Sequence, residues 1–342
     1  MDEHWKRRLD RMRAGLVREG DPVAWVTEVD AAQAVTRYPR LAVRGSLFGV
    51  AAREEGADAP WRVVMPVQTG MPQEARDSLQ SKFFFWAKDD TDDPKVRREL
   101  LAAVRVLERE PVDEVVVMGT TYRIVRGDEV ARTGADGLEP PRPTDPEPVF
   151  RVWERQRGAR RCLDTDAVLD PERASGLMAE ALRIGLREFH YAGKRYPADV
   201  RADSRKAVTT HPDIAMLPVG FGAVERAGDV WQPLGGLSPT PHEARRDLYG
   251  DLTDLWARLY KWDDGKRERY RRAGELFRAA ERADRVQVDG REFRICRVER
   301  LVRFGPDGPE GPRPSDVDEY GPTKMHPRMD EDGTLHYEEK DA

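Results

Sequence analysis

"GADGLEPPRPTD" (residues 134–145) and "GPDGPEGPRPSD" (residues 305–316) are two versions of one string, 171 positions apart in a chain of 342 residues. Proline excludes both from a helix or a central strand, while Gly137 and Gly308 suit a turn with positive φ. Glutamate, arginine and aspartate recur in both at the same spacing. We call these stretches the first strap and the second strap. Their repetition predicts a duplicated domain in which each copy closes with an extended segment.

Further matches occur in the same order along the chain, at offsets between 169 and 173 residues. The blocks are "AVTRYP" (34–39) with "AVTTHP" (207–212), "PQEARDSL" (72–79) with "PHEARRDL" (241–248), "FWAK" (85–88) with "LWAR" (255–258), and "GTTYRIVR" (119–126) with "GREFRICR" (290–297). Collinear matches at a nearly constant offset indicate an internal repeat. We therefore expect four parts: a first repeat at 1–147, a basic linker at 148–172, a second repeat at 173–318, and an acidic, flexible tail at 319–342. Residues 25–147 and 197–318 should share one topology.

Each repeat has the pattern of helices combined with antiparallel hairpins, which predicts an α+β fold. Apolar residues at helical spacing predict helices at Asp2–Arg18 and Pro94–Arg109. "EVVVMGTTYRIVR" (114–126) and "RVQVDGREFRICR" (285–297) alternate like strands around a two-residue turn. The positions expected to be buried are Phe48, Trp61, Leu79, Trp86, Leu100, Val104, Val117, Ile124, Phe221, Trp231, Leu248, Trp256, Phe277, Val288 and Ile295.

The charge of the chain is unevenly distributed. Charged residues make up 35% of the sequence and the formal net charge is −5. Residues 317–342 carry eight acidic and three basic side chains, so the rest of the chain is nearly neutral, which argues against a dedicated nucleic-acid binder. No stretch approaches the roughly 18 apolar residues of a membrane span, and residues 1–16 lack a secretory signal pattern. We expect a cytoplasmic protein without membrane contact.

The linker and one neighbouring segment contain candidate contact residues. A basic run with one aromatic residue, Trp153, is able to contact phosphate groups, although the favoured interpretation is a solvated connector. Its arginines are Arg151, Arg155, Arg157, Arg160 and Arg161. The segment "EFHYAGKRYP" (188–197) adds Glu188, His190, Tyr191 and Lys194, a polar cluster of the kind usually found on a surface.

The straps contain the two remaining candidates, Arg142 and Arg313. We expect these arginines to occupy equivalent positions and to bond a carboxylate or a backbone carbonyl of their own repeat. The alternative is that each strap is a polyproline-like element recognised by an outside molecule.

Recognisable catalytic and cofactor motifs are absent from the sequence. There is no GxGxxG, no GxxxxGK[ST] and no GxSxG pattern, and the histidines never occur as HxH or HxxxH. The two cysteines, Cys162 and Cys296, do not form a disulfide framework. We therefore predict no cofactor, no metal site and no catalytic residue.

The strings "MPQEARDSL" (71–79), "AKDDTDDP" (87–94) and "GPDGPEGPRPSD" together resemble an uncharacterised family of proteins from filamentous soil actinobacteria with a domain of unknown function. The resemblance covers most of the chain. It implies an intracellular actinobacterial protein and assigns no activity and no site residues.

The leading hypothesis is a non-catalytic, duplicated module that binds an unknown protein partner. One alternative is an enzyme with an unrecognised active site between the repeats, using Arg76 and Arg245, Glu74 and Glu243, or the cluster at 188–194. A weaker alternative is a nucleic-acid accessory protein that uses the arginine-rich linker. A deep pocket that gathers polar residues from both repeats would favour the enzyme.

Overall fold

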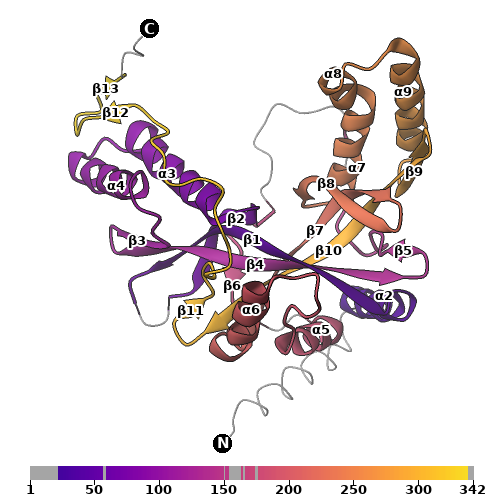
Figure 1. The fold of residues 1–342 in the computed structure, drawn as a ribbon, viewed down its shortest axis with the longest axis horizontal. Coiled ribbons are helices and arrows are strands. Elements are labelled where there is room, and N and C mark those ends of the chain that lie inside the picture. Colours follow the sequence, from indigo (N-terminus) through magenta and orange to yellow (C-terminus); the bar gives the residue numbers. More distant parts are fainter. Residues whose placement is uncertain are drawn as a thin grey trace, which may run out of the picture.

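Strands of both predicted repeats belong to one antiparallel sheet. The computed structural model describes residues 22–56, 59–149, 151–153, 163–164, 166–173 and 176–337, so the predicted helix at Asp2–Arg18 lies outside the described residues. The sheet has the order β6-β2-β1-β4-β10-β7-β8, with β3 and β5 also on β4, and β9 and β11 on β10 (Figure 1). Its strands are β1 (Arg40–Glu54), β2 (Trp61–Thr69), β3 (Glu114–Val117), β4 (Thr120–Gly134), β5 (Gly137–Leu138), β6 (Val168–Leu169), β7 (Asp213–Ala227), β8 (Val230–Ser238), β9 (Arg285–Val288), β10 (Arg291–Gly305) and β11 (Gly308–Pro309).

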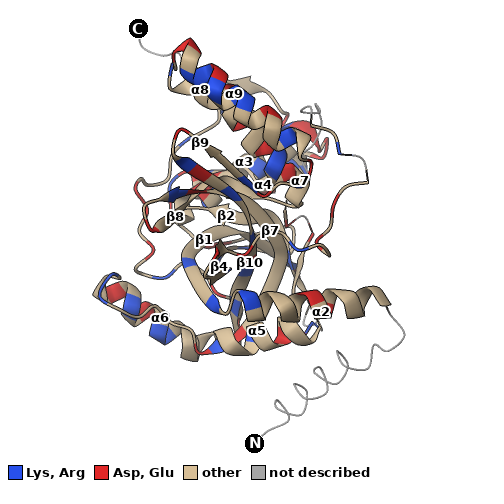
Figure 2. Ribbon diagram, turned by 90° about the vertical axis from the view of Figure 1, so that its right-hand side faces the viewer, with Lys and Arg blue, Asp and Glu red and all other residues tan. Residues whose placement is uncertain are grey.

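Helices cover both sides of the strands (Figure 2). They are α2 (Pro22–Arg37), α3 (Pro72–Asp89), α4 (Pro94–Leu107), α5 (Leu177–Arg187), α6 (Ala198–Thr210), α7 (Pro241–Gly250), the π-helix η1 (Asp251–Leu255), α8 (Trp256–Leu259) and α9 (Asp264–Ala279). Proline begins α3, α4 and α7, where its missing N–H costs nothing. The combination of helices with an antiparallel sheet confirms the predicted α+β class.

The order of elements in the first half (residues 22–149) recurs in the second half (residues 176–318). In the first half β2 pairs with β1 and β1 with β4, while β3 and β5 add to β4. In the second half β8 pairs with β7 and β7 with β10, while β9 and β11 add to β10. This agrees with the expectation of a shared topology. The two halves meet where β4 pairs with β10, with Val130 opposite Glu299.

Each half has its own apolar core, which lies between the sheet and the helices that pack on one face of it. In the first half, α3 and α4 pack on a cluster that includes Phe48, Leu79, Leu100 and Ile124. In the second half, the segments from α7 to α9 pack on the matching cluster. The burial predictions are confirmed at every position except Trp86 and Trp231, which are partly buried. The spacing of apolar residues therefore located both cores.

The sheet curls, so that its strands also meet on the side away from α3 and α4. A third apolar cluster combines Ala51 and Val67 of the first half with Leu217 and Val302 of the second. Arg300 on β10 donates to the Val67 carbonyl on β2 at 3.1 Å, although β1 and β4 separate these strands in the sheet. The curled sheet thus makes one body of the two halves.

The described part of the linker enters this curled region. Asp164 is fully buried and bonds the guanidinium of Arg300, and Leu163 and Leu169 are buried too. Strand β6 pairs with β2 through Leu169 and Trp61. The linker was expected to be a solvated connector, and this end of it is instead part of the core.

The C-terminal segment, residues 319–337, lies against the first half (Figure 1). The Tyr320 hydroxyl donates to Asp77 at 3.0 Å, and the ring of His326 stacks on Phe84. The segment then forms a small hairpin, β12 (Arg328–Met329) with β13 (Leu335–His336), and buries Met329 in the first core. The acidic tail is therefore in contact with α3 and α4 along most of its described length.

The described residues were also searched for membrane-spanning helices. None of the helices among them combines the length and the apolar character that crossing a membrane requires.

Candidate functional site

The first strap leaves β4 and crosses the second half. Arg294 donates to the Asp136 carbonyl, and the backbone N–H of Arg297 donates to the Glu139 carbonyl at 2.9 Å. The Arg297 guanidinium also bonds Asp145 at 3.0 Å. The first strap is therefore attached to β10 of the second half, while the Glu139 N–H still donates to the Arg132 carbonyl on β4 of its own half at 2.9 Å.

The second strap crosses the first half in the same way. Arg123 donates to the Asp307 carbonyl at 2.9 Å, and the N–H of Arg126 donates to the Glu310 carbonyl at 2.8 Å. The Arg126 guanidinium bonds Asp316 at 2.9 Å. Each of these donors lies 171 positions before its equivalent on β10, so the two crossings are reciprocal.

Just beyond each strap, an acid reaches a buried arginine on a helix of the opposite half. Glu147 bonds Arg245 on α7 at 2.5 Å, and Asp318 bonds Arg76 on α3 at 2.7 Å. Arg245 and Arg76 were candidate catalytic residues of the enzyme alternative. Here Arg76 and Arg245 anchor the straps, one in each half. Among the described residues, no contact joins these two arginines.

The strap arginines have the contacts predicted for them. Arg142 donates to Glu139 at 2.6 Å, and Arg313 donates to Glu310 at 2.7 and 3.0 Å. Both arginines bond a carboxylate of their own repeat at matching positions. Arg142 differs from Arg313 in one respect, because it also borders a cavity.

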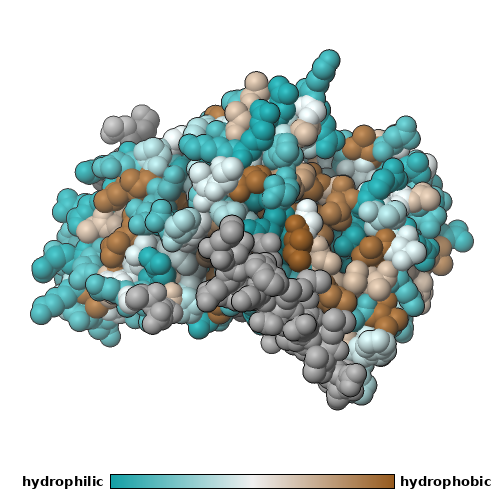
Figure 3. Space-filling model, turned by 90° about the horizontal axis from the view of Figure 1, so that it is seen from below, coloured by the Kyte–Doolittle hydropathy of each residue, from teal (hydrophilic) through white to brown (hydrophobic). Residues whose placement is uncertain are grey.

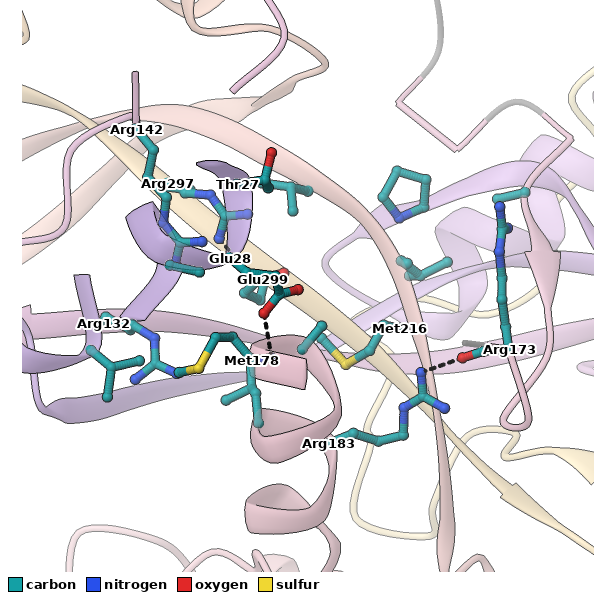
Figure 4. A pocket seen from close by; sticks show the side chains of 18 of the residues that line it. Thr27, Glu28, Arg132, Arg142, Arg173, Met178, Arg183, Met216, Arg297 and Glu299 are labelled. Carbon is teal, nitrogen blue, oxygen red and sulfur yellow. Dashed lines mark hydrogen bonds and ion pairs between the residues drawn. The ribbon is translucent and has the colours of Figure 1, made fainter. Parts of the chain in front are cut away.

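This cavity, of about 480 Å³, lies between the halves. Its described lining comes from α2, β4, the first strap, β6, α5, β7 and β10. Arg132, Arg142 and Arg297 lie on one side, Arg173 and Arg183 lie on the other, and Met178 and Met216 lie between them (Figure 4). The face that carries α2, α5 and α6 is mostly hydrophilic, with apolar residues scattered over it (Figure 3). The volume suits a small molecule rather than a polymer.

Arg132 is a partly buried arginine of this lining. Its guanidinium is partly buried and makes no hydrogen bond or ion pair within the described residues. Burial lowers the pKa of Arg132, and the positive charges of Arg142 and Arg297 act in the same direction, against Glu139 and Glu299. An arginine keeps its proton in this situation, so the cavity presents a fixed positive charge.

The other two arginines on this side are held firmly. Arg297 bonds both Asp145 and Glu299, and its side chain is 9% exposed. Arg142 uses one nitrogen for Glu139 and is 11% exposed. Side chains fixed in this way lose little conformational entropy when a ligand binds. The guanidinium groups of Arg142 and Arg297 are therefore held rigidly, and together with that of Arg132 they form what we call the cationic wall.

The acidic lining residues have structural partners. Glu28 on α2 accepts the backbone N–H of Met178 at the beginning of α5, at 2.9 Å. One oxygen of Glu299 bonds Arg297, while its Oε2 has no partner in the part of the chain that the structure describes. This free oxygen gives the cationic wall one neighbouring acceptor.

The remaining sequence candidates lie elsewhere. Arg151 bonds Glu281 at 3.4 Å, and His190 is exposed. The arginines Arg155, Arg157, Arg160 and Arg161 lie outside the described residues. Tyr191 was placed in a surface cluster, which is wrong for its side chain: it is 4% exposed and its hydroxyl donates to Asp128 at 2.6 Å.

Sequence reasoning missed Arg132, Arg297 and Glu299. They alternate with apolar residues on β4 and β10, where they look like the solvent side of ordinary strands. Their convergence depends on the β4–β10 pairing and on the strap crossing, and neither leaves a local signal. Among the described residues, no group of three or more His, Cys, Asp or Glu side chains is arranged to hold a metal ion.

Comparison with known proteins adds one match. A family model described as "Family of unknown function (DUF5954)" matches residues 21–319. No curated protein and no solved structure matches the chain.

Proposed function

The chain belongs to the DUF5954 family, and we propose that it is a tandem duplication which acts as a non-catalytic binding module for a small anionic molecule. The ligand occupies the cavity between the halves. The duplication is supported by the collinear sequence blocks, by the matched strand order, and by the reciprocal contacts of the straps.

The observation that carries the ligand class is the guanidinium of Arg132, which has no partner among the described residues and lies beside Arg142 and Arg297. Arg142 and Arg297 are paired with Glu139, Asp145 and Glu299, so the charge without a bonded carboxylate among the described residues is that of Arg132. A partly buried charge without a partner is unfavourable. A bound carboxylate or phosphate would neutralise this charge and give Arg132 the acceptors that the described part of the chain does not supply. A pocket with such a charge pattern is complementary to an anion.

The cavity gathers polar residues from both halves, which the sequence analysis named as a mark of an enzyme. Binding fits the chemistry better. Arginine holds its proton and does not act as a general acid or base. Glu28 accepts a backbone N–H, and Glu299 is held by Arg297 through one oxygen, so that its Oε2 serves as an acceptor for a ligand. The predicted protein partner, cytoplasmic location and actinobacterial origin stay predictions.

The test is a ligand-observed NMR screen of the full chain against a defined set of organic carboxylates and phosphate esters. We expect at least one anion to bind, and the Arg132→Gln variant to weaken its binding by tenfold or more. Arg258→Gln is the matched control, because Arg258 on α8 is 71% exposed and none of the cavity-lining residues belongs to α8. Equal binding by both variants, or no binding by any anion, would contradict the proposal.

A further inference from the structure

We propose that the ligand of this cavity is a small organic acid that carries a hydroxyl group on a ring. The inference rests on the proposed function and deepens it. Its basis is that the chain fills the equivalent position of its other half with its own Tyr191.

Two charged residues relate Tyr191 to the cavity. The Tyr191 hydroxyl donates to Asp128 at 2.6 Å, and Arg126 bonds both oxygens of Asp128 at 3.1 Å. The residues 171 positions later are Glu299 and Arg297, which form the same arginine–carboxylate pair and line the cavity.

Two further neighbours of Tyr191 also correspond to cavity residues. Gly45 lies so close to the Tyr191 hydroxyl that a side chain on it would collide with the ring, and its counterpart 173 positions later is Pro218. The Tyr191 N–H donates to the Ser204 hydroxyl at 2.8 Å, and the counterpart of Ser204 is Ala31. Pro218 and Ala31 both line the cavity. Four independent positions thus place the tyrosyl side chain and the cavity at equivalent sites.

The sequence explains why one site holds a tyrosyl side chain and the other holds no equivalent side chain among the described residues. After the matched block "IGLRE" (184–188), nine residues that include Tyr191 lead to α6. After the corresponding block "AGLVRE" (14–19), Gly20 and Asp21 alone precede α2. The first half therefore has no residue in sequence that corresponds to Tyr191.

The filled site shows which groups a ligand needs. Asp128 accepts a ring hydroxyl while it remains bonded to Arg126, and Glu299 has an equivalent arrangement with its Oε2 free among the described residues. At the other end, Arg303 donates to the carbonyls of Leu186 at 3.1 Å and Phe189 at 2.7 Å, which belong to the segment that leads to Tyr191.

The counterpart of Arg303 in the open site is Arg132, which has no such acceptor within the described residues. An occupant of the cavity satisfies both ends if it donates a hydroxyl to Glu299 and offers an anionic group to Arg132. A ring between the two groups would take the place of the tyrosyl ring.

The first experiment compares 4-hydroxyphenylacetate with phenylacetate by isothermal titration calorimetry on the full chain. We expect the hydroxylated acid to bind at least about tenfold more tightly, because a buried acceptor left unpaired by the other acid weakens its binding. We also expect one site per chain. Glu299→Gln should reduce the preference for the hydroxylated acid to less than about threefold. Asp128→Asn changes the equivalent carboxylate, which binds the Tyr191 hydroxyl, and should leave the preference unchanged.

The second experiment opens the filled site. The Tyr191→Gly variant should bind 4-methylphenol, which is the missing side chain, and its melting temperature should rise on binding, while that of the unaltered chain should not. If this variant does not fold, the calorimetric comparison still decides. Equal affinity of the two acids, or binding of neither acid where phosphates bind through Arg132, overturns the hydroxyl assignment and leaves the proposed function intact. If no anion binds in a way that depends on Arg132, both the hydroxyl assignment and the proposed function are wrong.

Discussion

Arg300 and Asp164 form an ion pair that is shielded from solvent on every side. The exposed fractions of their side chains are 1% and 0%. Asp164 also accepts the N–H of Val67 at 3.0 Å, and Arg300 donates to the Pro218 carbonyl at 2.9 Å. One pair of side chains thereby connects the linker, β2, β7 and β10. The counterpart of Arg300 in the first half is Glu129, so this connection has no symmetric partner.

We expect Asp164→Ala to lower the free energy of unfolding by about 3–5 kcal/mol, because it leaves a charged arginine buried without its partner. Urea denaturation followed by circular dichroism measures the change. The control is Arg271→Ala, which breaks the Arg271–Glu268 pair, whose side chains are 52% and 60% exposed. That variant should have little effect on the free energy of unfolding. Similar costs for the two variants would show that the buried pair has no special role.

Cys296 should be chemically inert in the folded chain. Burial raises the pKa of the Cys296 thiol to about 12, so the reactive thiolate is nearly absent at pH 8. In a Cys162→Ser background, iodoacetamide should modify Cys296 at a rate limited by unfolding, which mass spectrometry measures. Rapid modification at the rate of a free cysteine in native buffer would contradict the burial of this residue.

Single residues differ in how well the sequence predicts them. The burial of Phe48 or Ile295 follows from period-two or helical spacing, which is a local property. The role of Asp164 or Arg132 depends on strands more than a hundred positions away, and charged residues in such patterns are normally assigned to the surface. The chemistry of the site was therefore the part that local patterns did not reveal.

Beyond the short strands β5 and β11, the straps have no regular secondary structure, yet their paths are defined. Each strap makes backbone hydrogen bonds to a strand and ends near an arginine anchor on a helix. In the first strap the Thr144 hydroxyl also donates to Asp30 on α2, and in the second the Ser315 N–H donates to Asp203 on α6. Proline lowers the entropy that such a segment loses on folding. The sequence predicted the extended form of the straps. Their crossing to the opposite half was not predictable, because nothing in the string states which half it contacts.

The two anchors should be energetically equivalent. Arg76→Ala and Arg245→Ala each remove charge-assisted bonds to two carboxylates, Asp113 with Asp318 and Asp284 with Glu147. We expect each variant to lose about 1.5–3 kcal/mol of unfolding free energy in thermal denaturation. A cost for one anchor and none for the other would contradict the equivalence of the straps.

The docking of residues 319–337 should depend on pH through His326. Burial lowers the pKa of His326, whose ring stacks on Phe84 and whose Nε2 lies 2.9 Å from the Ser81 hydroxyl. The undocked histidine therefore takes up a proton first. The stabilisation is fully present above the unfolded pKa of about 6.5 and is lost as the pH falls through that value towards the lower folded pKa.

Hydrogen exchange of this segment, corrected for intrinsic rates, should show protection that decreases severalfold between pH 7.5 and pH 5.5. His326→Gln should remove most of that pH dependence. Unchanged protection in the original chain would mean that His326 does not control the docking.

The two halves form one continuous structure through the β4–β10 pairing, the curled sheet and the exchanged straps. We expect calorimetry of the full chain to show one unfolding transition, and variants such as Leu79→Ala and Leu248→Ala, one in each core, to shift the same transition. Residues 22–149 expressed alone should fail to fold, because β4 would expose a long unpaired edge. Two separate transitions would show that the halves are independent.

The repetition and the fold class were predictable at the level of the whole chain, because collinear blocks and hairpin patterns are contained in the sequence itself. The boundaries at 147 and 173 suggested domains side by side. The central pairing of Val130 with Glu299 joins them instead. Strand periodicity indicates that an edge exists but does not identify the strand that will cover it.

The exchanged straps have a consequence for ancestry. If the chain is a duplication, a single copy could build this sheet by pairing with a second molecule, as a homodimer with swapped straps. Such a homodimer would have two identical sites, both empty or both filled. Fusion of the copies into one gene releases that constraint, so that one site keeps Tyr191 as permanent packing while the other is free to diverge towards a ligand.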